Sequence, residues 1–434
     1  MTGTPLARLR RRDRLEAYAD DTRAGLGVRP TARSCGLSPG TVQRWRHRIV
    51  VDPIVDETKE PVIGFVSLFS GLGALDLGLE SAGPTVLAVE KHQAFAEAFT
   101  HARETMGVDA PPVVVDDVGT LLGDRRGQLA EAVETAREKY GVAAIVGGPP
   151  CPDFSIAGKQ AGSAGINGRL TEVFVDVVLD AKPDVMVFEN VKGLVSTSSH
   201  REFYDGLKDR LRNGGYALTD RVLNALDYGV AQDRERIFLI GFNRKSFDDA
   251  DAMAEQFDWT AHAEPVDEGI AWPTAVPFAE NGSRCYPRRM KESHRPLTVQ
   301  HWFSRNGTDN HPNAAHHFEP RSGLPRMKAI AEGDTSRKSY KRLHRYRYSP
   351  TAAYGNNEVH LHPYLPRRLS AAEAMAIQSF PANFTLPQNM TLSDMFKSIG
   401  NSVPFLLAKA IGKSLADCLG KASRHQDRPS CDGP

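Results

Sequence analysis

The sequence has few cysteines, and none lies in a spacing that metal sites use. Its 434 residues include five cysteines, scattered and odd in number, with no C-x-x-C pair. This speaks against a cysteine-rich zinc site and a disulfide framework, and it favours a reducing, cytoplasmic environment. No stretch approaches the roughly 20 apolar residues that a membrane helix needs. The N-terminal arginines precede no apolar run, so we predict neither a secretory signal nor membrane association.

The sequence also has little net charge, only +1, but its positive charge is concentrated. Residues 1–50 carry eleven Arg and no Lys against four acids, and residues 284–347 carry fifteen Lys and Arg against five acids. Two basic segments on an otherwise acidic chain predict two surfaces that meet phosphate, with solvated charged faces as the alternative. Six of the fourteen histidines lie in the second segment without ligand spacing, so we predict no metal site.

Short β-branched runs alternate with helical patterns from Val62 to Asn243. The runs "TVLAVE", "AAIVGG" and "DVMVFENV" are apolar throughout and bounded by Gly or Pro. This pattern predicts an α/β fold in which a parallel sheet is covered by helices on both faces and binds ligands at the carboxyl ends of its strands. Residues 245–365 have weak periodicity and predict a separate, irregular domain. A helix then follows, with a capping box formed by Ser370 and Glu373.

The segment "FVSLFSGLGALDLGLESAG" predicts a strand, a glycine turn and a helix. Gly71 and Gly73 allow backbone amides to approach a ligand at a helix N-terminus, and Asp76 stands where a dinucleotide fingerprint has a third glycine. Glu90 ends the next strand and is placed to bind ribose hydroxyls, and Asp117 ends the third and could hold an adenine amine. These residues predict a nucleoside-containing cofactor, with a simple tight turn as the alternative. The Walker lysine pattern is absent, which argues against ATP chemistry.

Three further stretches carry residues suited to chemistry. In "GGPPCPDFS", Cys151 follows an apolar run in a restricted backbone, and it is either a nucleophile at a strand end or a small core residue. Glu189 in "VFENV" should be partly desolvated, with a raised pKa suited to donating a proton to a ring nitrogen, unless it is a capping or salt-bridged acid. Arg234 and Arg236 alternate along "QDRERIFLIGF" and should share one face, where they clamp a polar ligand or form a salt-bridged strand edge.

The blocks "FSGLG", "GGPPCPDFS", "FENV", "QDRERIFLIG", "RRLSAAEAMAIQSFP" and "IGNSVP" occur in this order. In the presence and order of these blocks, residues 62–244 and 349–412 resemble the bacterial C5-cytosine DNA methyltransferases. The resemblance implies a Rossmann-like sheet that binds S-adenosyl-L-methionine, a smaller target-recognition domain, and double-stranded DNA as substrate. Together with the composition of the remaining segments, it divides the chain into a helix-turn-helix unit (1–50), a linker (51–61), the catalytic domain (62–244 and 349–418), the recognition domain (245–348) and a disordered tail (419–434).

The resemblance also implies roles for individual residues. Cys151 matches the nucleophile that forms a covalent adduct with C6 of a flipped cytosine, Glu189 the acid at N3 and N4, and Arg234 and Arg236 the pair that supports the base and the catalytic loop. The residues expected to bind the cofactor are Phe69, Ser70, Gly71, Gly73, Glu90, Asp117, Val118, Pro150, Asn401 and Ser402. The sequence departs from the family at Pro152, where many members have Gln or Asn, and at Asn167 and Leu170.

Residues 31–46, "TARSCGLSPGTVQRWR", predict a helix-turn-helix that binds DNA, with a docking or dimerisation unit as the alternative. Some methyltransferases that resemble this sequence carry such an extension and repress their own promoters with it, and we hypothesise this second role here. A cognate restriction endonuclease is a further possible partner. The residues predicted to contact DNA are Thr41, Gln43, Arg44, Arg48, Arg288, Arg289, Lys338, Lys341 and Arg342.

Two other functions compete with a DNA methyltransferase. The first is a tRNA cytosine-5 methyltransferase, because one branch of the family uses the same motifs on tRNA. The second is a DNA-binding regulator with an inactive catalytic domain, against which the intact Cys151, Glu189 and Arg236 argue. The basic recognition domain and the predicted helix-turn-helix both favour DNA.

Overall fold

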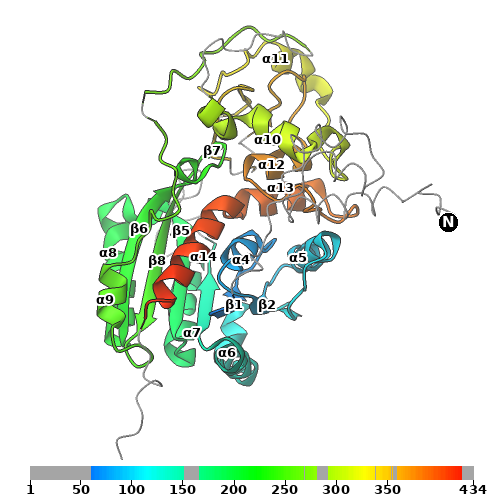
Figure 1. Ribbon diagram of the computed structural model, residues 1–434. Helices are drawn as coiled ribbons and strands as arrows, with labels where there is room; N and C mark the ends of the chain where they lie inside the picture. The colour runs from blue at the N-terminus through cyan, green and yellow to red at the C-terminus, as the bar shows by residue number, and fades with distance from the viewer. Residues whose placement is uncertain are drawn as a thin grey trace, which may run out of the picture.

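The computed structural model describes residues 60–150, 166–267, 269–280, 292–337, 339–352, 354 and 359–422. Within these ranges, the main feature is a seven-stranded sheet with the order β3-β2-β1-β4-β5-β8-β6 (Figure 1). Its strands are β1 (Gly64–Leu68), β2 (Thr85–Val89), β3 (Val113–Val114), β4 (Ala143–Gly147), β5 (Val185–Val191), β6 (Tyr216–Asn224) and β8 (Glu235–Asn243).

One strand departs from the predicted parallel sheet. β8 pairs antiparallel with both β5 and β6, whereas β1 to β5 pair parallel. The purely parallel prediction was therefore wrong for β8. Because this strand is buried on both faces, its apolar run "RIFLIGF" looks the same in either direction and carries no signal for orientation.

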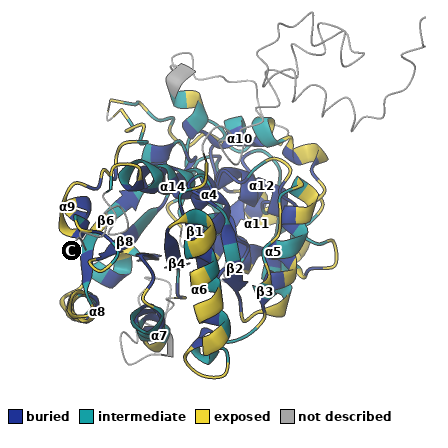
Figure 2. Ribbon diagram, turned by 60° about the horizontal axis from the view of Figure 1, so that its bottom comes forward, coloured by how far each residue is buried: buried dark blue, intermediate teal, exposed yellow. Residues whose placement is uncertain are grey.

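Helices cover both faces of the sheet, because alternate residues of each strand point to opposite sides. Val187 and Ile240 belong to the core under α4 (Ala74–Leu79), α9 (Ala250–Glu255) and α14 (Phe405–Leu419). Met186 and Leu239 belong to the core under α6 (Arg126–Tyr140), α7 (Ile166–Ala181) and α8 (Ser198–Asn213). Figure 2 shows β1 and β4 buried at the centre of the sheet and the outer surface of α6 exposed. This confirms the α/β expectation of a sheet between two helical layers.

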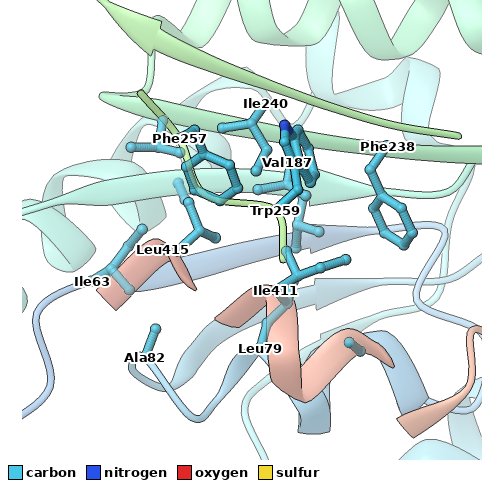
Figure 3. Close-up of a cluster of buried hydrophobic side chains, with 14 of the residues drawn as sticks. Ile63, Leu79, Ala82, Val187, Phe238, Ile240, Phe257, Trp259, Ile411 and Leu415 are labelled. Carbon is cyan, nitrogen blue, oxygen red and sulfur yellow. The ribbon is translucent and has the colours of Figure 1, made fainter. Parts of the chain in front are cut away.

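The sheet's helical cover extends further along the chain than the sequence suggested. Phe257 and Trp259 pack in the same core cluster as Ile411 and Leu415 of α14 (Figure 3). The Trp259 indole donates to the Thr219 hydroxyl at 3.2 Å. Apolar side chains between Phe247 and Trp259 thus pack on the sheet, beyond the predicted boundary at residue 245. The name "recognition region" denotes residues 260–348.

Above the sheet in Figure 1 lie α10 (Val299–Asn306), α11 (Leu324–Lys328), α12 (Ala371–Ile377) and α13 (Leu392–Asn401). Short strands join the segments here: β7 (Gln232–Asp233) pairs with β10 (Ser349–Pro350), and β9 (Lys341–Arg342) with β11 (His360–Leu361).

Helix α12 packs in two directions. Ala376 and Ile377 share a cluster with Trp302 of α10, whereas Ala374 and Met375 share one with α4, α5 (Gln93–Met106) and α13. Its N-terminus carries the predicted capping box, which is confirmed. α12 therefore connects the recognition region to the sheet's helical cover. No helix in the described ranges has the length and apolar character needed to span a membrane.

Candidate active site

The carboxyl ends of β1, β2, β4 and β5 meet at one edge of the sheet, as parallel strands require. A cavity of about 1590 Å³ opens at this edge. Its wall brings together most of the residues that the sequence singled out: Phe69, Ser70, Gly71, Glu90, Asp117, Val118, Pro150, Glu189, Arg234, Arg236, Lys341, Asn401 and Ser402. Residues separated by more than 300 positions in the chain thus share one cavity.

The glycine turn (Phe69–Gly73) between β1 and α4 forms one wall of this cavity. Three of its residues have positive φ: Phe69 and Gly71 at 55°, and Gly73 at 75°. Glycine adopts this conformation freely, but a bulky residue such as Phe69 is strained there, so the surrounding contacts must hold it. A Cβ at Gly71 would meet no atom within 4 Å, so the space above the turn is open.

Gly73 is constrained both by the turn and by helix α5. Its N–H donates to the Ser70 carbonyl at 2.8 Å, and a Cβ at this position would lie 2.6 Å from the Phe99 ring. It is also absent from the cavity wall. Gly73 therefore shapes the turn and lets α5 pack closely, and its part in cofactor binding stays a prediction.

Two carboxylates line the same side of the cavity. Glu90 accepts from the backbone N–H groups of Gly71 at 2.9 Å and His92 at 2.7 Å, and so ties the end of β2 to the glycine turn. Asp117 accepts from the Gly119 N–H and pairs with Lys91 at 2.9 Å. The Lys91 hydrogen bond, followed by that of Gly119, lowers the pKa of Asp117, so this carboxyl is ionised at neutral pH.

The opposite wall comes from the end of α13. Asn401 is exposed to the cavity, and Ser402 is buried, with its hydroxyl donating to the Ser398 carbonyl at 2.9 Å. The glycine turn and this wall come from opposite ends of the described chain, so only the fold could show that they face one cavity.

Glu189, which is buried, forms an ion pair with the partly buried Arg236 in the cavity wall. They lie on the neighbouring antiparallel strands β5 and β8, and Arg236 Nε is 3.0 Å from Glu189 Oε1. Burial raises the pKa of Glu189 above its ordinary value, and the charges of Arg236 and Arg234 offset only part of that effect. A carboxyl with a raised pKa beside a fixed cation can hold a proton for a polar ligand.

The two glycines before Cys151 allow the chain to pass close to this carboxyl. A Cβ at Gly148 would lie 2.7 Å from Glu189 Oε2, so only glycine fits there without displacing the acid. The Asn190 side-chain amide donates to the Pro149 carbonyl at 3.3 Å. The backbone thus enters the cavity wall at Pro150 beside Glu189. Cys151 itself lies outside the described residues.

Arg234 and Arg236 both line the cavity, but their guanidinium groups contact different partners. Arg234 is 1% exposed, and its guanidinium donates to the backbone carbonyls of Ala352, Gly400 and Ser402. Arg236 thus contacts a carboxylate and Arg234 contacts backbone carbonyls, which are both partners that the sequence led us to expect for these arginines. Their joint support of a flipped base stays a prediction.

Of the predicted DNA-contacting residues, only Lys341 and Arg342 lie in the described ranges. Lys341 reaches the cavity wall from the recognition region. Arg342 is fully buried and donates to the carbonyls of Met327, Ile330, His362 and Leu365, so the prediction that it faces DNA is corrected. The others lie outside the described residues: Thr41, Gln43, Arg44, Arg48, Arg288, Arg289 and Lys338.

Asp76 is a cavity-lining residue to which the sequence interpretation gave no role. It is 2% exposed, and its Oδ1 has no hydrogen-bond partner. Burial raises its pKa to about 6, with the Ser67 hydroxyl and Arg103 acting in the opposite direction and Glu80 adding to the rise. The available signal was Asp76 itself, a charged residue on the apolar helix "ALDLGL".

Replacing Asp76 with Asn is expected to change the pH dependence of stability. A carboxyl whose folded-state pKa lies near 6, above its ordinary 3.8, disfavours the folded state as it ionises between these pH values. Asp76→Asn should therefore raise the free energy of unfolding at pH 8 by up to roughly 3 kcal/mol, and much less at pH 4. Urea unfolding at both pH values measures this. Asp251→Asn, on an exposed carboxyl paired with Arg244, is the control. An equal effect of Asp76→Asn at both pH values would contradict the assignment.

The profile of the C-5 cytosine-specific DNA methylase family matches residues 63–417, and the chain belongs to this family. It is 48% identical over 390 residues to "Type II methyltransferase M.NmeDI" of Neisseria meningitidis, covering 88% of each chain. It is 30% identical to "Type II methyltransferase M.XorII" of Xanthomonas oryzae, covering 82% of this chain and 85% of the relative.

A solved structure shares the fold. It is a prophage-encoded protein of E. coli described as a DNA modification methyltransferase, with a TM-score of 0.56, 22% identity, and coverage of 83% of this chain and all of that one. With the family membership, the chain is a DNA (cytosine-5-)-methyltransferase, EC 2.1.1.37. The tRNA methyltransferase and the inactive regulator are accordingly set aside.

Proposed function

We propose that the protein methylates C5 of a cytosine within a specific double-stranded DNA sequence, as the modification enzyme of a type II restriction-modification system. The observation that carries this proposal is a single cavity that joins the glycine turn, the Glu189–Arg236 pair and the backbone leading to Cys151. The system is inferred from relatives named type II methyltransferases, one of them 48% identical. A cognate restriction endonuclease would then be its functional partner.

The residues at the cavity edge fit S-adenosyl-L-methionine, the methyl donor of the family. The space above Gly71 is open, Glu90 and Asp117 are acids at neighbouring strand ends, and Val118 adds a buried apolar contact. Phe69, Ser70, Pro150, Asn401 and Ser402 would complete the binding site. When bound, this group supplies an electrophilic methyl for C5 of the cytosine.

The chain's own residues would make C5 reactive. We infer that the Cys151 thiolate adds to C6, forming a C–S bond and placing electron density on C5. Glu189, whose pKa is raised by burial, would hold a proton at N3 and so stabilise the charge of the ring, while Arg236 keeps the carboxyl in place. After methylation, a base removes the C5 proton, the C–S bond breaks and the thiolate is released.

The target atom is hidden inside a DNA duplex, so the cytosine must be flipped into the cavity. Lys192 and Lys341 both line the cavity, from the end of β5 and from the recognition region. Two lysines on different walls suit the phosphates on either side of a flipped nucleotide. Lys192 also pairs with Glu235 at 2.8 Å, which fixes its position beside Arg236.

Bisulfite sequencing of DNA from cells that express the protein tests the proposed function. A consistent set of protected cytosines is expected, and their flanking bases would supply the recognition sequence. DNA from cells with an empty vector is the control. If no cytosine is protected above this background, the proposed function is wrong.

We further propose that residues 1–50, which lie outside the described residues, bind DNA as a helix-turn-helix and repress the protein's own promoter. The eleven arginines of this segment support the proposal. In a gel-shift assay with the full chain, Arg44→Ala/Arg48→Ala should weaken binding to the upstream promoter by about 10-fold or more while leaving methyl transfer unchanged. If the wild-type protein binds promoter DNA and random DNA equally well, the proposed repression is contradicted.

A further inference from the structure

Arg234 is a buried cation that holds three separate segments together. One guanidinium nitrogen donates to the Gly400 and Ser402 carbonyls, each at 2.9 Å, and the other donates to the Ala352 carbonyl at 3.3 Å. The Arg234 backbone N–H donates to the Asn224 side chain at 3.3 Å. With 1% of the residue exposed, water cannot replace these partners.

Each of the segments belongs to a different part of the enzyme. Gly400 and Ser402 flank Asn401, on the wall proposed to close the cofactor site. Ala352 follows β10, where the chain returns from the recognition region. Arg234 itself begins the segment that carries Arg236, the partner of Glu189. One side chain therefore joins the cofactor wall, the segment that returns from the recognition region and the cytosine site.

The connection to the recognition region is built by several bonds. β10 pairs with β7, with Ser349 opposite Gln232, and the Ser349 N–H donates to the Ala231 carbonyl at 2.9 Å. The Thr351 hydroxyl also donates to the Asp233 carbonyl. A displacement of the return segment when DNA binds would thus be transmitted to Arg234.

The energetics support a positional role for this residue. Its hydrogen-bond partners are backbone atoms, its Nε has no partner, and the nearby charge of Arg236 is repulsive, with Glu189 only partly compensating. Burying a cation in this way is costly unless its hydrogen bonds are complete. The guanidinium of Arg234 is stabilised by the carbonyls of Ala352, Gly400 and Ser402. Arg234 therefore favours the arrangement in which both the return segment and the cofactor wall lie against it.

We propose that Arg234 is a positioning residue that couples DNA binding to cofactor binding, so that each ligand tightens the binding of the other. The coupling is reciprocal, because both ligands favour the same arrangement of the carbonyls around one guanidinium. This inference rests on the proposed cofactor site, and it assigns Arg234 a role distinct from contact with the cytosine.

The chain offers a matched control in Arg342. This arginine is also fully buried and bonded to carbonyls, but its partners lie between Met327 and Leu365 and touch neither the cofactor wall nor Glu189. Lys in place of either arginine keeps the charge and loses most of the carbonyl bonds. Both variants should lose stability, but only Arg234→Lys should lose the coupling.

The test measures the Kd of S-adenosylhomocysteine by calorimetry, with and without a duplex carrying the sequence found by bisulfite sequencing. We expect the duplex to tighten binding to the wild-type enzyme by roughly 5- to 150-fold, the usual range for coupled sites. In Arg234→Lys the ratio should fall to near one, and in Arg342→Lys it should stay at the wild-type value. Thr351→Val removes a hydrogen bond of the same connection without altering a buried charge, and it should partly reduce the ratio of the two Kd values. This variant provides the test if Arg234→Lys does not fold.

The possible outcomes are distinct. A wild-type ratio of one, or a ratio preserved in both Arg234→Lys and Thr351→Val, overturns the coupling and leaves the cofactor site intact. A ratio lost equally in Arg342→Lys also overturns it, because general destabilisation would then be the cause. If the wild type does not bind S-adenosylhomocysteine, the proposed cofactor site fails, and the coupling fails with it.

Discussion

Replacing Cys151 with serine is expected to reduce methyl transfer by on the order of 10³-fold or more. A thiol with a pKa near 8.5 is partly ionised at neutral pH, whereas a serine hydroxyl is not and is the weaker nucleophile toward C6. The measurement is methyl incorporation into a duplex carrying the recognition sequence. A duplex with 5-fluorocytosine at the target position adds a second readout. Fluorine replaces the C5 proton that the base must remove, so the adduct cannot break down. The wild type should therefore remain covalently attached to this duplex, and Cys151→Ser should not.

The control for Cys151→Ser is binding. The variant should bind S-adenosylhomocysteine with the wild-type Kd, because the glycine turn and Glu90 are unchanged. Lost activity with unchanged binding assigns the residue to chemistry. If Cys151→Ser still forms a covalent complex with the fluorinated duplex, another residue is the nucleophile and the proposed mechanism is wrong.

Glu189→Gln is expected to reduce the turnover rate by roughly 10²- to 10⁴-fold, the usual range for a general acid. Glutamine keeps the shape of the side chain but cannot supply a proton to N3. It also leaves the partly buried Arg236 without a carboxylate at 3.0 Å, so some loss of stability should accompany the loss of rate.

The pH dependence separates these two effects. Burial raises the pKa of Glu189, so the protonated acid persists to higher pH than for an ordinary carboxyl, and the rate it supports should fall as pH rises through that raised pKa. Glu189→Gln should lack this limb of the pH–rate profile. Glu332→Gln is the matched control: Glu332 is equally buried and pairs with Arg345 at 2.6 Å, but in the recognition region. If the rate of Glu189→Gln still falls at higher pH as in the wild type, a group other than Glu189 causes that part of the pH–rate profile.

Parts of the fold were predictable because the signals were local. Alternating apolar runs and helical patterns between Val62 and Asn243 predicted the layered α/β sheet, and the spacing of Ser370 and Glu373 predicted a helix start that is confirmed. The antiparallel direction of β8 was not predictable, because a strand buried on both faces is apolar throughout. The packing of Trp259 under α14 depends on contacts between residues more than 150 positions apart.

The candidate site divides in the same way. Residue type and order suggested Glu90, Asp117, Glu189 and Arg236, because acids and arginines at strand ends fall where a parallel sheet binds ligands. Arg342 was counted as DNA-facing because a basic segment carries no information on which of its residues are buried. Carbonyls from four other residues surround it, and none of them is distinctive in sequence.

The sequence by itself determined the class of sheet, the edge at which ligands bind and the chemical types available there. Strand periodicity and the glycines of the turn are local properties. They act through the conformation of the backbone at their own positions, which does not depend on residues distant in the sequence. Only the tertiary structure decided that Gly148 must be glycine beside the Glu189 carboxylate, that Asp76 lines the cavity with an unpartnered oxygen, and that Arg234 holds Ala352, Gly400 and Ser402. Each of these depends on a desolvated polar group and the particular atoms brought against it, and that proximity exists only once distant segments pack.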